Sequence, residues 1–234
     1  MELFSMDGCL FLLRWIHFLV GITWIGVLYY FNFIQTPFFA TADAPVRSAM
    51  IRGLVPNALW WFRWGAMFTF LSGWTIVLAK LHLGGVSAQA GYLTLILTGG
   101  LMGTFMWANV WFVIWPAQQV VIASAEQVAG GGEAIPEAAA RGQRAGLASR
   151  TNTLFSFPML FFMGSASHFQ GLLSASPGYG LYWLLALVVI VAVEINALIG
   201  PGLATQKPLG SVSGTIHAGL ALTLVLYIIA STTL

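Results

Sequence analysis

Charged residues are scarce in this chain of 234 residues, where Asp, Glu, Lys and Arg together make up only 7%. Soluble domains carry about 25% charged residues, so this composition cannot cover a surface that faces water. The net charge of +2 is too small to indicate a nucleic-acid-binding protein. The single cysteine, Cys9, excludes an internal disulfide and a Cys-x-x-Cys-His site for covalent c-type haem.

Long apolar runs account for much of the chain. Six of them are long enough to cross a bilayer as helices, since about 20 residues span the hydrocarbon core. Their expected bounds are 9–35, 59–79, 91–115, 152–172, 179–199 and 213–233. Backbone groups in lipid must be satisfied internally, and no alternating barrel pattern is present, so helices are predicted. We expect one all-α, polytopic transmembrane bundle over residues 1–234.

The distribution of cations predicts the orientation of this bundle. With the N-terminus outside, only Arg14 and Lys80 fall on the outer side, as the positive-inside rule requires. The remaining cations then lie on or near the cytoplasmic side: Arg47, Arg52, Arg63, Arg141, Arg144, Arg150 and Lys207. An even number of spans returns the C-terminus to the outside. The connection at about 116–149 is expected to be a cytoplasmic loop or to form short interfacial helices at about 117–128 and 137–147.

Histidines inside or at the rim of the apolar runs are the candidate cofactor ligands. His17 is followed one helical turn later by Gly21, and His168 is preceded by Gly164. His217 also has small residues on its own helical face. A flat porphyrin against a helix needs an imidazole for its iron and a missing side chain beside it. The pattern therefore predicts haem b.

The depth of each histidine selects the expected axial pair. His17 lies near the start of the first run and His168 near the end of the fourth, so both fall in the outer half. These two are the predicted metal ligands, whereas His217 falls in the inner half and would hold a second cofactor or none. Arg14 would pair with a propionate or extend to the membrane surface. Each histidine could instead simply bond a neighbouring helix.

Other polar residues also lie within the runs. Glu194 is the only acidic residue deep in a span, and it is expected either to carry protons or to pair with a donor such as Asn. Asn32, Asn109 and Asn152 are expected to form hydrogen bonds between helices. Arg150 to Asn152 are expected to begin a helix at the cytoplasmic surface, where an anion could bind.

Three segments resemble a known family. They are RWIHFLVGITWIGVLYYFNF at 14–33, LWWFRWGAMF at 59–68 and SRTNTLFSFPMLFFM at 149–163. These segments are similar to the membrane domain of bacterial urate hydroxylases, the cytochrome c-linked urate oxidases. The resemblance implies a protein of the bacterial inner membrane that oxidises urate and passes the electrons onward. The opening helix is also broadly similar to small membrane haem b proteins, which favours haem on His17.

The sequence departs from that family in two ways. It ends at Leu234, whereas the family's membrane domain is usually longer, and it lacks the Cys-x-x-Cys-His motif of the fused cytochrome. We therefore expect a haem b redox protein embedded in the lipid bilayer, with a separate cytochrome as its partner. The alternative is a non-catalytic accessory subunit of a larger respiratory or photosynthetic membrane complex. A transporter ranks last, because no inverted repeat is visible.

Overall fold

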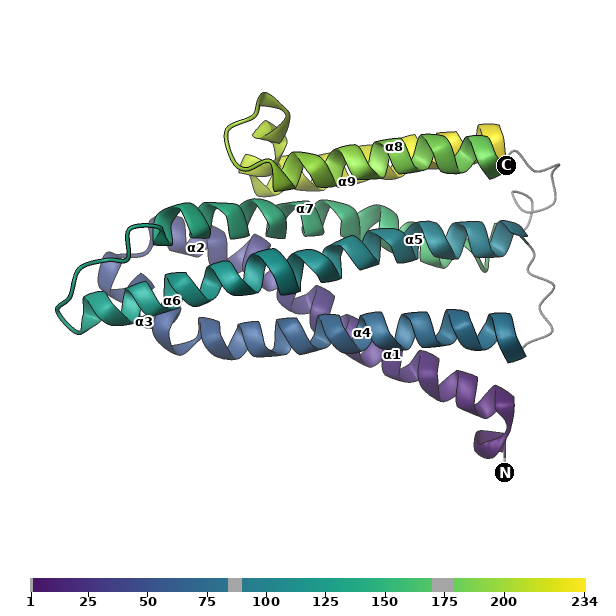
Figure 1. The fold of residues 1–234 in the computed structure, drawn as a ribbon, viewed down its shortest axis with the longest axis horizontal. Helices are drawn as coiled ribbons and strands as arrows, with labels where there is room; N and C mark the ends of the chain where they lie inside the picture. The colour runs from purple at the N-terminus through teal and green to yellow at the C-terminus, as the bar shows by residue number, and fades with distance from the viewer. Residues whose placement is uncertain (1, 84–89, 170–178) are drawn as a thin grey trace.

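The computed structural model of the protein describes residues 2–83, 90–169 and 179–234. These residues form helices joined by short connections, with no strand among them. The long helices run side by side along one axis, and both termini lie at the same end of the molecule (Figure 1). The prediction of an all-α helical bundle is confirmed.

The helices follow the order of the expected runs. Their bounds are α1 Met6–Tyr29, α2 Thr36–Thr41, α3 Ala44–Gly53, α4 Val55–Leu83, α5 Ala90–Ala108, α6 Trp115–Ala129, α7 Ala138–Ser165, α8 Tyr179–Leu198 and α9 Val212–Thr233. Two π-helical segments, η2 Tyr30–Gln35 and η3 Asn109–Ile114, and two 3₁₀ segments, η1 Glu2–Phe4 and η5 Ala204–Gly210, complete them. Among the described residues, five stretches are long and apolar enough to span a membrane: Met6–Thr41, Val55–His82, Gly91–Ala129, Tyr179–Leu198 and Val212–Thr233. The protein is therefore embedded in a membrane.

Helix α7 differs from these five stretches. It corresponds to the run expected at 152–172, of which residues 170–172 lie outside the described part of the chain. Arg150, Thr151 and Asn152 interrupt its apolar sequence, and all three are buried. This burial is possible because α7 packs against α1, α5, α6, α8 and α9, so that its polar side chains face protein. Helix α7 is the central helix of the bundle.

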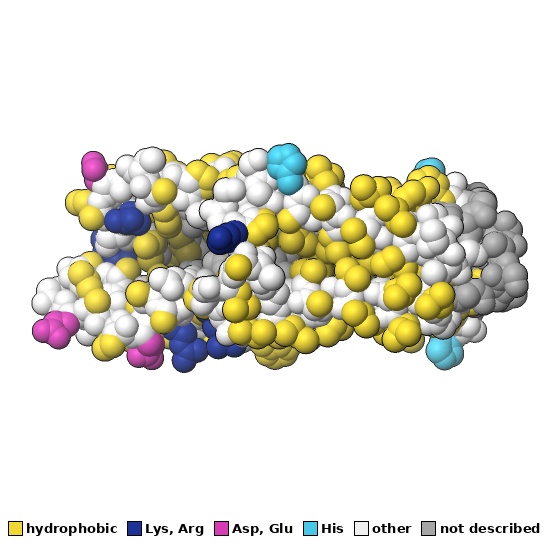
Figure 2. Space-filling view, turned by 90° about the horizontal axis from the view of Figure 1, so that it is seen from above, with side chains coloured by type: hydrophobic (Ala, Val, Ile, Leu, Met, Phe, Trp, Pro, Cys, Tyr) yellow, Lys and Arg dark blue, Asp and Glu magenta, His cyan; other side chains and the backbone are white. Residues whose placement is uncertain are grey.

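The predicted interfacial helices at about 116–149 are not separate elements. Residues 117–128 belong to α6, which continues α5 through η3, and residues 138–147 are the first turns of α7. The 39 residues of Gly91–Ala129 are about 58 Å long at 1.5 Å per residue, roughly twice the hydrocarbon thickness. These helices therefore extend beyond the apolar part of the bundle. On the face in Figure 2, Lys, Arg, Asp and Glu gather at this end, which we call the charged end.

Prolines explain the two π-helical segments. Pro37 lies in the first turn of α2 and Pro116 in the first turn of α6, directly after η2 and η3 respectively. A proline in a continuing helix lacks the backbone N–H and clashes with the carbonyl four residues earlier. A wider π turn lets the helix continue past the proline without this hydrogen bond, and such turns often occur at functional sites. Each π turn also holds a buried asparagine, Asn32 in η2 and Asn109 in η3.

Glycines bring α7 close to its neighbours. A Cβ on Gly99 of α5 would lie 2.7 Å from Met163 Cγ and 3.0 Å from the Met159 carbonyl oxygen, both on α7. A Cβ on Gly219 of α9 would lie 2.7 Å from the Phe157 ring. Small residues of this kind allow membrane helices to pack closely through van der Waals contact. The central position of α7 therefore depends on glycine at these crossings.

We expect Gly99→Ala to lower the thermal unfolding midpoint of the detergent-purified protein. The added methyl group must displace Met163 and the α7 backbone, at a cost of about 1–3 kcal/mol. Gly100→Ala is the matched control, since a Cβ on Gly100 meets nothing within 4 Å. That control should be neutral or stabilising, because alanine favours helix by about 1 kcal/mol over glycine. Equal midpoints for the two variants would contradict the close α5–α7 crossing.

Candidate functional site

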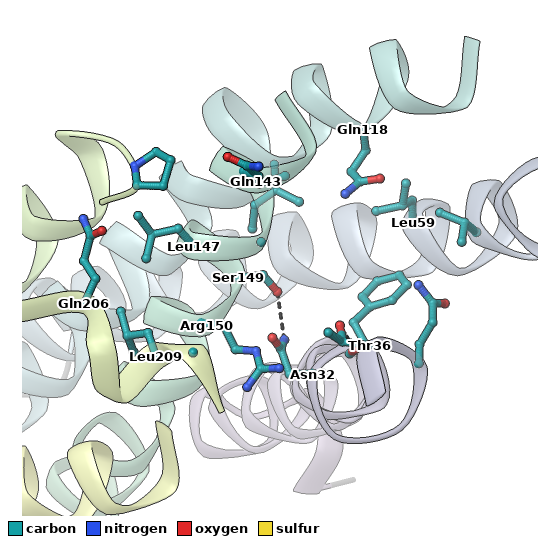
Figure 3. Close-up of a pocket in the computed structure, with 18 residues that line it drawn as sticks. Asn32, Thr36, Leu59, Gln118, Gln143, Leu147, Ser149, Arg150, Gln206 and Leu209 are labelled. Atoms are coloured by element: carbon teal, nitrogen blue, oxygen red, sulfur yellow. Dashed lines mark hydrogen bonds between the residues drawn. The ribbon is translucent and has the colours of Figure 1, made fainter. Parts of the chain in front are cut away.

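A cavity of about 420 Å³ lies at the charged end, where several helices and their connections meet. Its walls come from η2, α2, α4, η3, α6, α7 and the segment between α8 and α9 (Figure 3). The polar residues that line it are Asn32, Gln35, Thr36, Gln118, Gln143, Ser149, Arg150 and Gln206. Five carboxamides and one guanidinium thus surround the cavity, and neither a carboxylate nor an imidazole is part of its lining.

Arg150 is the only charged residue in the lining. Its side chain is 9% exposed, and in Figure 3 it points toward the side of the cavity where Asn32 lies. Its one hydrogen bond runs from Nη1 to Thr215 Oγ1 at 3.5 Å, which is long for such a contact. Within the described residues Arg150 forms no ion pair. A buried guanidinium without a counter-charge is costly, so the cavity is suited to an anion.

Two of the lining amides have structural roles. Asn32 Nδ2 donates to the Leu28 carbonyl at 2.9 Å and to Ser149 Oγ at 2.8 Å (Figure 3), which joins the first π turn to α7. Gln206 Nε2 donates to the Asn196 and Gly200 carbonyls, and its Oε1 accepts from the N–H groups of Gly202 and Leu203. Gln206 therefore shapes the connection between α8 and α9.

The other three lining amides are available to a ligand. Gln35 Oε1 is buried and has no hydrogen-bond partner in the described structure. The side chains of Gln118 and Gln143 lie on α6 and α7 and likewise form no hydrogen bond to a described residue. A carboxamide can both donate and accept, so these groups can bind the edge of a polar ring.

A second polar cluster lies on another face of the same α7 segment. Asn109 Nδ2 donates to Asn152 Oδ1 at 3.0 Å and to Glu194 Oε2 at 3.1 Å. Asn152 Nδ2 donates to the Met106 carbonyl at 2.9 Å. The Glu194 side chain is 5% exposed, and the cluster joins η3, α7 and α8. These contacts confirm that Asn109 and Asn152 bond between helices and that an Asn donor pairs with Glu194.

We expected the segment Arg150–Asn152 to begin a helix, and this prediction is wrong. The segment lies in the middle of α7. Arg150 lines the cavity, whereas Asn152 belongs to the Glu194 cluster. Thr151, between them, is fully buried and its hydroxyl has no hydrogen-bond partner among the described residues. One turn of α7 therefore serves both polar sites.

His17 of α1 faces α4. Its Nδ1 lies 3.0 Å from Ser72 Oγ, and that hydroxyl donates to the Phe68 carbonyl at 2.6 Å. Since the Ser72 proton is used in this way, Nδ1 of His17 donates to Ser72 and Nε2 keeps a free lone pair. A Cβ on Gly73 would lie 3.0 Å from His17 Cε1. Gly21 also faces α4, where a Cβ would approach Thr69 at 3.8 Å.

His168 and His217 are both exposed. His168 lies beyond the end of α7 and its Nδ1 donates to the Gly164 carbonyl at 2.9 Å. His217 Nδ1 donates to the Ser213 carbonyl at 2.7 Å. A Cβ on Gly164 would meet nothing within 4 Å. As with His17, a hydrogen bond at Nδ1 leaves Nε2 free, an arrangement that metal-ligating histidines share.

The structure does not bring the predicted axial pair together. Helix α1 touches α7 near its own C-terminal end, where Tyr29 OH and Ser156 Oγ lie 2.8 Å apart, and the two helices diverge toward the chain's N-terminus (Figure 1). No group of three or more His, Cys, Asp or Glu residues that could hold a metal occurs within the described ranges. Arg14 is exposed and forms no ion pair there. Axial ligation by His17 and His168 stays a prediction.

These features define a polytopic membrane protein with a cationic, amide-lined cavity at one end of its bundle. The family model for the urate oxidase N-terminal region matches residues 77–230, about two-thirds of the chain, and the protein belongs to this family. The match includes Asn109, Arg150 and Glu194 but not His17 or Asn32. No curated protein and no solved structure matches the chain.

Sequence reasoning did not identify the glutamines of the cavity. Gln35, Gln118 and Gln143 lie 83 and 25 residues apart in the chain, and only the fold brings them together. The available signal was the position of Gln35 and Gln118 at the ends of apolar runs, where long uncharged polar side chains reach the interface, whereas Gln143 lies nine residues before the next run and carried no such signal.

We expect Asn109→Ala to lower the thermal unfolding midpoint in detergent by an amount that corresponds to about 1–3 kcal/mol. The variant leaves Asn152 Oδ1 and Glu194 Oε2 without their common donor. Asn57→Ala is the control, since Asn57 at the start of α4 is exposed and bonds only the Gly53 carbonyl at the end of α3. Its effect should stay below about 0.5 kcal/mol. A destabilisation by Asn109→Ala no larger than that of Asn57→Ala would argue against the cluster.

Proposed function

We propose that this protein is a redox component of the bacterial inner membrane that binds urate, or a closely similar planar anion, in the cavity at its charged end. The observation that carries this proposal is Arg150, a buried guanidinium without a counter-charge in a lining of carboxamides. Membership of the urate oxidase N-terminal family supports urate as the ligand. Electrons from the oxidation would pass to a separate acceptor such as a cytochrome.

The chemistry of the cavity suits this class of ligand. Urate is a flat fused ring whose edges alternate N–H and C=O groups, and it carries one negative charge at neutral pH. The planar guanidinium of Arg150 can bind such an anion through two parallel hydrogen bonds. Gln35, Gln118 and Gln143 can satisfy both donors and acceptors on the ring edge. The volume of about 420 Å³ lies in the range of about 300–1,000 Å³ that small-molecule sites occupy.

Haem b is the electron carrier that we propose for the bundle. When bound, it would supply one-electron transfer between substrate and acceptor. We propose His17 as the residue that would hold it, because His17 is half-buried against α4 and bonds Ser72 through Nδ1, whereas His168 and His217 are exposed. In the described structure α1 diverges from α7 toward the end of the bundle where His17 and His168 lie. We therefore assign no electron-transfer step to a His17–His168 pair.

We expect urate to bind the detergent-purified protein in equilibrium dialysis, and Arg150→Gln to weaken binding by about 10- to 100-fold. A hydrogen bond to a charged group contributes about 1.5–3 kcal/mol, and each 1.4 kcal/mol is about tenfold in affinity. Arg144→Gln is the matched control, because Arg144 is an exposed cation on the same helix and does not line the cavity. Equal losses in the two variants would show nonspecific attraction and sink the proposed site.

We expect the reduced-minus-oxidised spectrum of the purified protein to show a b-type α-band that His17→Ala removes. His82→Ala should keep the band, since His82 is exposed at the end of α4 and bonds only the Leu78 carbonyl. A flat spectrum of folded wild-type protein would refute haem binding. Together with absent urate binding, it would favour the accessory-subunit alternative, which co-purification with other subunits at fixed stoichiometry would then test.

A further inference from the structure

We propose that Arg63 binds the phosphate of an anionic phospholipid in the membrane leaflet at the charged end. The site lies where α4 packs against η3 and α6 (Figure 1). Arg63 does not line the cavity, so this inference is independent of the function proposed above. It follows from the indole rings that hold the guanidinium and from the lack of a counter-charge for it among the described residues.

Aromatic rings hold the Arg63 side chain in place. Its Cζ lies 4.0 Å from the centroid of the Trp115 ring, 5.1 Å from that of Trp111 and 5.6 Å from that of Trp64. Trp111 also meets Trp64 edge-on, with 5.6 Å between the ring centroids. A guanidinium that packs on aromatic faces keeps the N–H groups in its own plane available to a phosphate. The rings therefore orient Arg63 without occupying its donors.

No described residue neutralises the charge of Arg63. Within the described part of the chain it forms no hydrogen bond and no ion pair, and its Nε is buried without a partner. Its two terminal nitrogens are not enclosed by the protein. An unpaired cation at the edge of the hydrocarbon core is costly, and such residues usually pair with another group. Because the side chain is only half-buried, a lipid can supply that group.

The level of Arg63 in the bundle matches that of lipid headgroups. It lies near the start of the apolar stretch Val55–His82, at the charged end. Trp60, one helical turn before it on the same face, is exposed, and exposed tryptophans are typical of the membrane–water interface. Phe68, toward the apolar middle of the bundle, is also exposed and stacks on Trp64. The surface around Arg63 therefore offers apolar rings to acyl chains beside a cation for the headgroup.

An anionic phospholipid is the partner that fits this arrangement. Arginine binds phosphate through two parallel hydrogen bonds, and basic sites between helices on the cytoplasmic side bind lipid headgroups. A lipid with a net negative charge is favoured over a zwitterionic one, because the seven cations of this end outnumber its acidic residues, which are Asp43, Glu126, Glu133 and Glu137. Free phosphate would lack the contact of acyl chains with the exposed rings of Trp60 and Phe68.

The test is thermal unfolding of the detergent-purified full chain with dioleoylphosphatidylglycerol, dioleoylphosphatidylcholine or inorganic phosphate at equal concentrations. A ligand that binds only the folded protein raises the unfolding midpoint. We expect phosphatidylglycerol to raise the midpoint of the wild type most, and Arg63→Gln to weaken its apparent affinity by about tenfold or more. Arg52→Gln is the matched control and should keep the wild-type shift, because Arg52 is an exposed cation at the same end.

Three results would overturn the proposal. An unchanged phosphatidylglycerol shift in Arg63→Gln would show that the contacts of Arg63 with the indole rings are structural only. Equal losses in Arg63→Gln and Arg52→Gln would show diffuse attraction to the charged end. An equal shift with inorganic phosphate would show a site for a soluble anion.

If Arg63→Gln does not fold, native mass spectrometry with an equimolar mixture of the two lipids decides. Preferential retention of phosphatidylglycerol by the wild type, preserved in Arg52→Gln, supports the proposal. Equal retention of the two lipids by the wild type, or a preference that Arg52→Gln abolishes, refutes it.

Discussion

Polar groups inside a membrane bundle have no water to bond, and this constraint determines how the helices surround α7. The buried face of α7 carries hydroxyl, amide and guanidinium groups, each of which needs a partner from protein. Asn32 in the first π turn donates a hydrogen bond to Ser149, and Asn109 in the second π turn donates one to Asn152. Helices α5 and α9 can come close enough only because Gly99 and Gly219 lack side chains. Hydrogen bonds determine which helices pack against α7, and the two glycines determine how closely α5 and α9 approach it.

The two π turns connect this architecture to the cavity. Each arises where a proline, Pro37 or Pro116, interrupts the regular hydrogen-bond ladder of a long helix. Each wider turn directs one asparagine at α7, and the last residues of the two segments, Gln35 and Ile114, form part of the cavity wall. The same local feature therefore stabilises the bundle and shapes the cavity. Two long helices contribute it independently, and both reach the same segment of α7, at Ser149 and Asn152.

Apolar length predicts the run at 152–172 that α7 contains, but it does not predict that α7 lies at the centre of the bundle. Contacts with five other long helices bury the middle of α7, and this burial by protein is what allows Arg150 and Asn152 within the helix. The cavity could not be predicted, because Gln35, Gln118 and Gln143 converge only through tertiary packing. Histidine spacing predicts faces on single helices, and the divergence of α1 from α7 is not encoded in that spacing.

The separation of Arg150 from Glu194 bears on function. A direct ion pair in low dielectric would satisfy both charges and leave neither available to a ligand. The carboxylate instead takes its hydrogen bond from the neutral Asn109, while the guanidinium is directed to the cavity with one long contact to Thr215. Each charge is thus only partly compensated, and in the proposed site a bound anion would supply the missing counter-charge of Arg150. Apolar residues at both positions would often be equally or more stable, so a buried, unpaired arrangement of the two charges supports the proposal of an anion site.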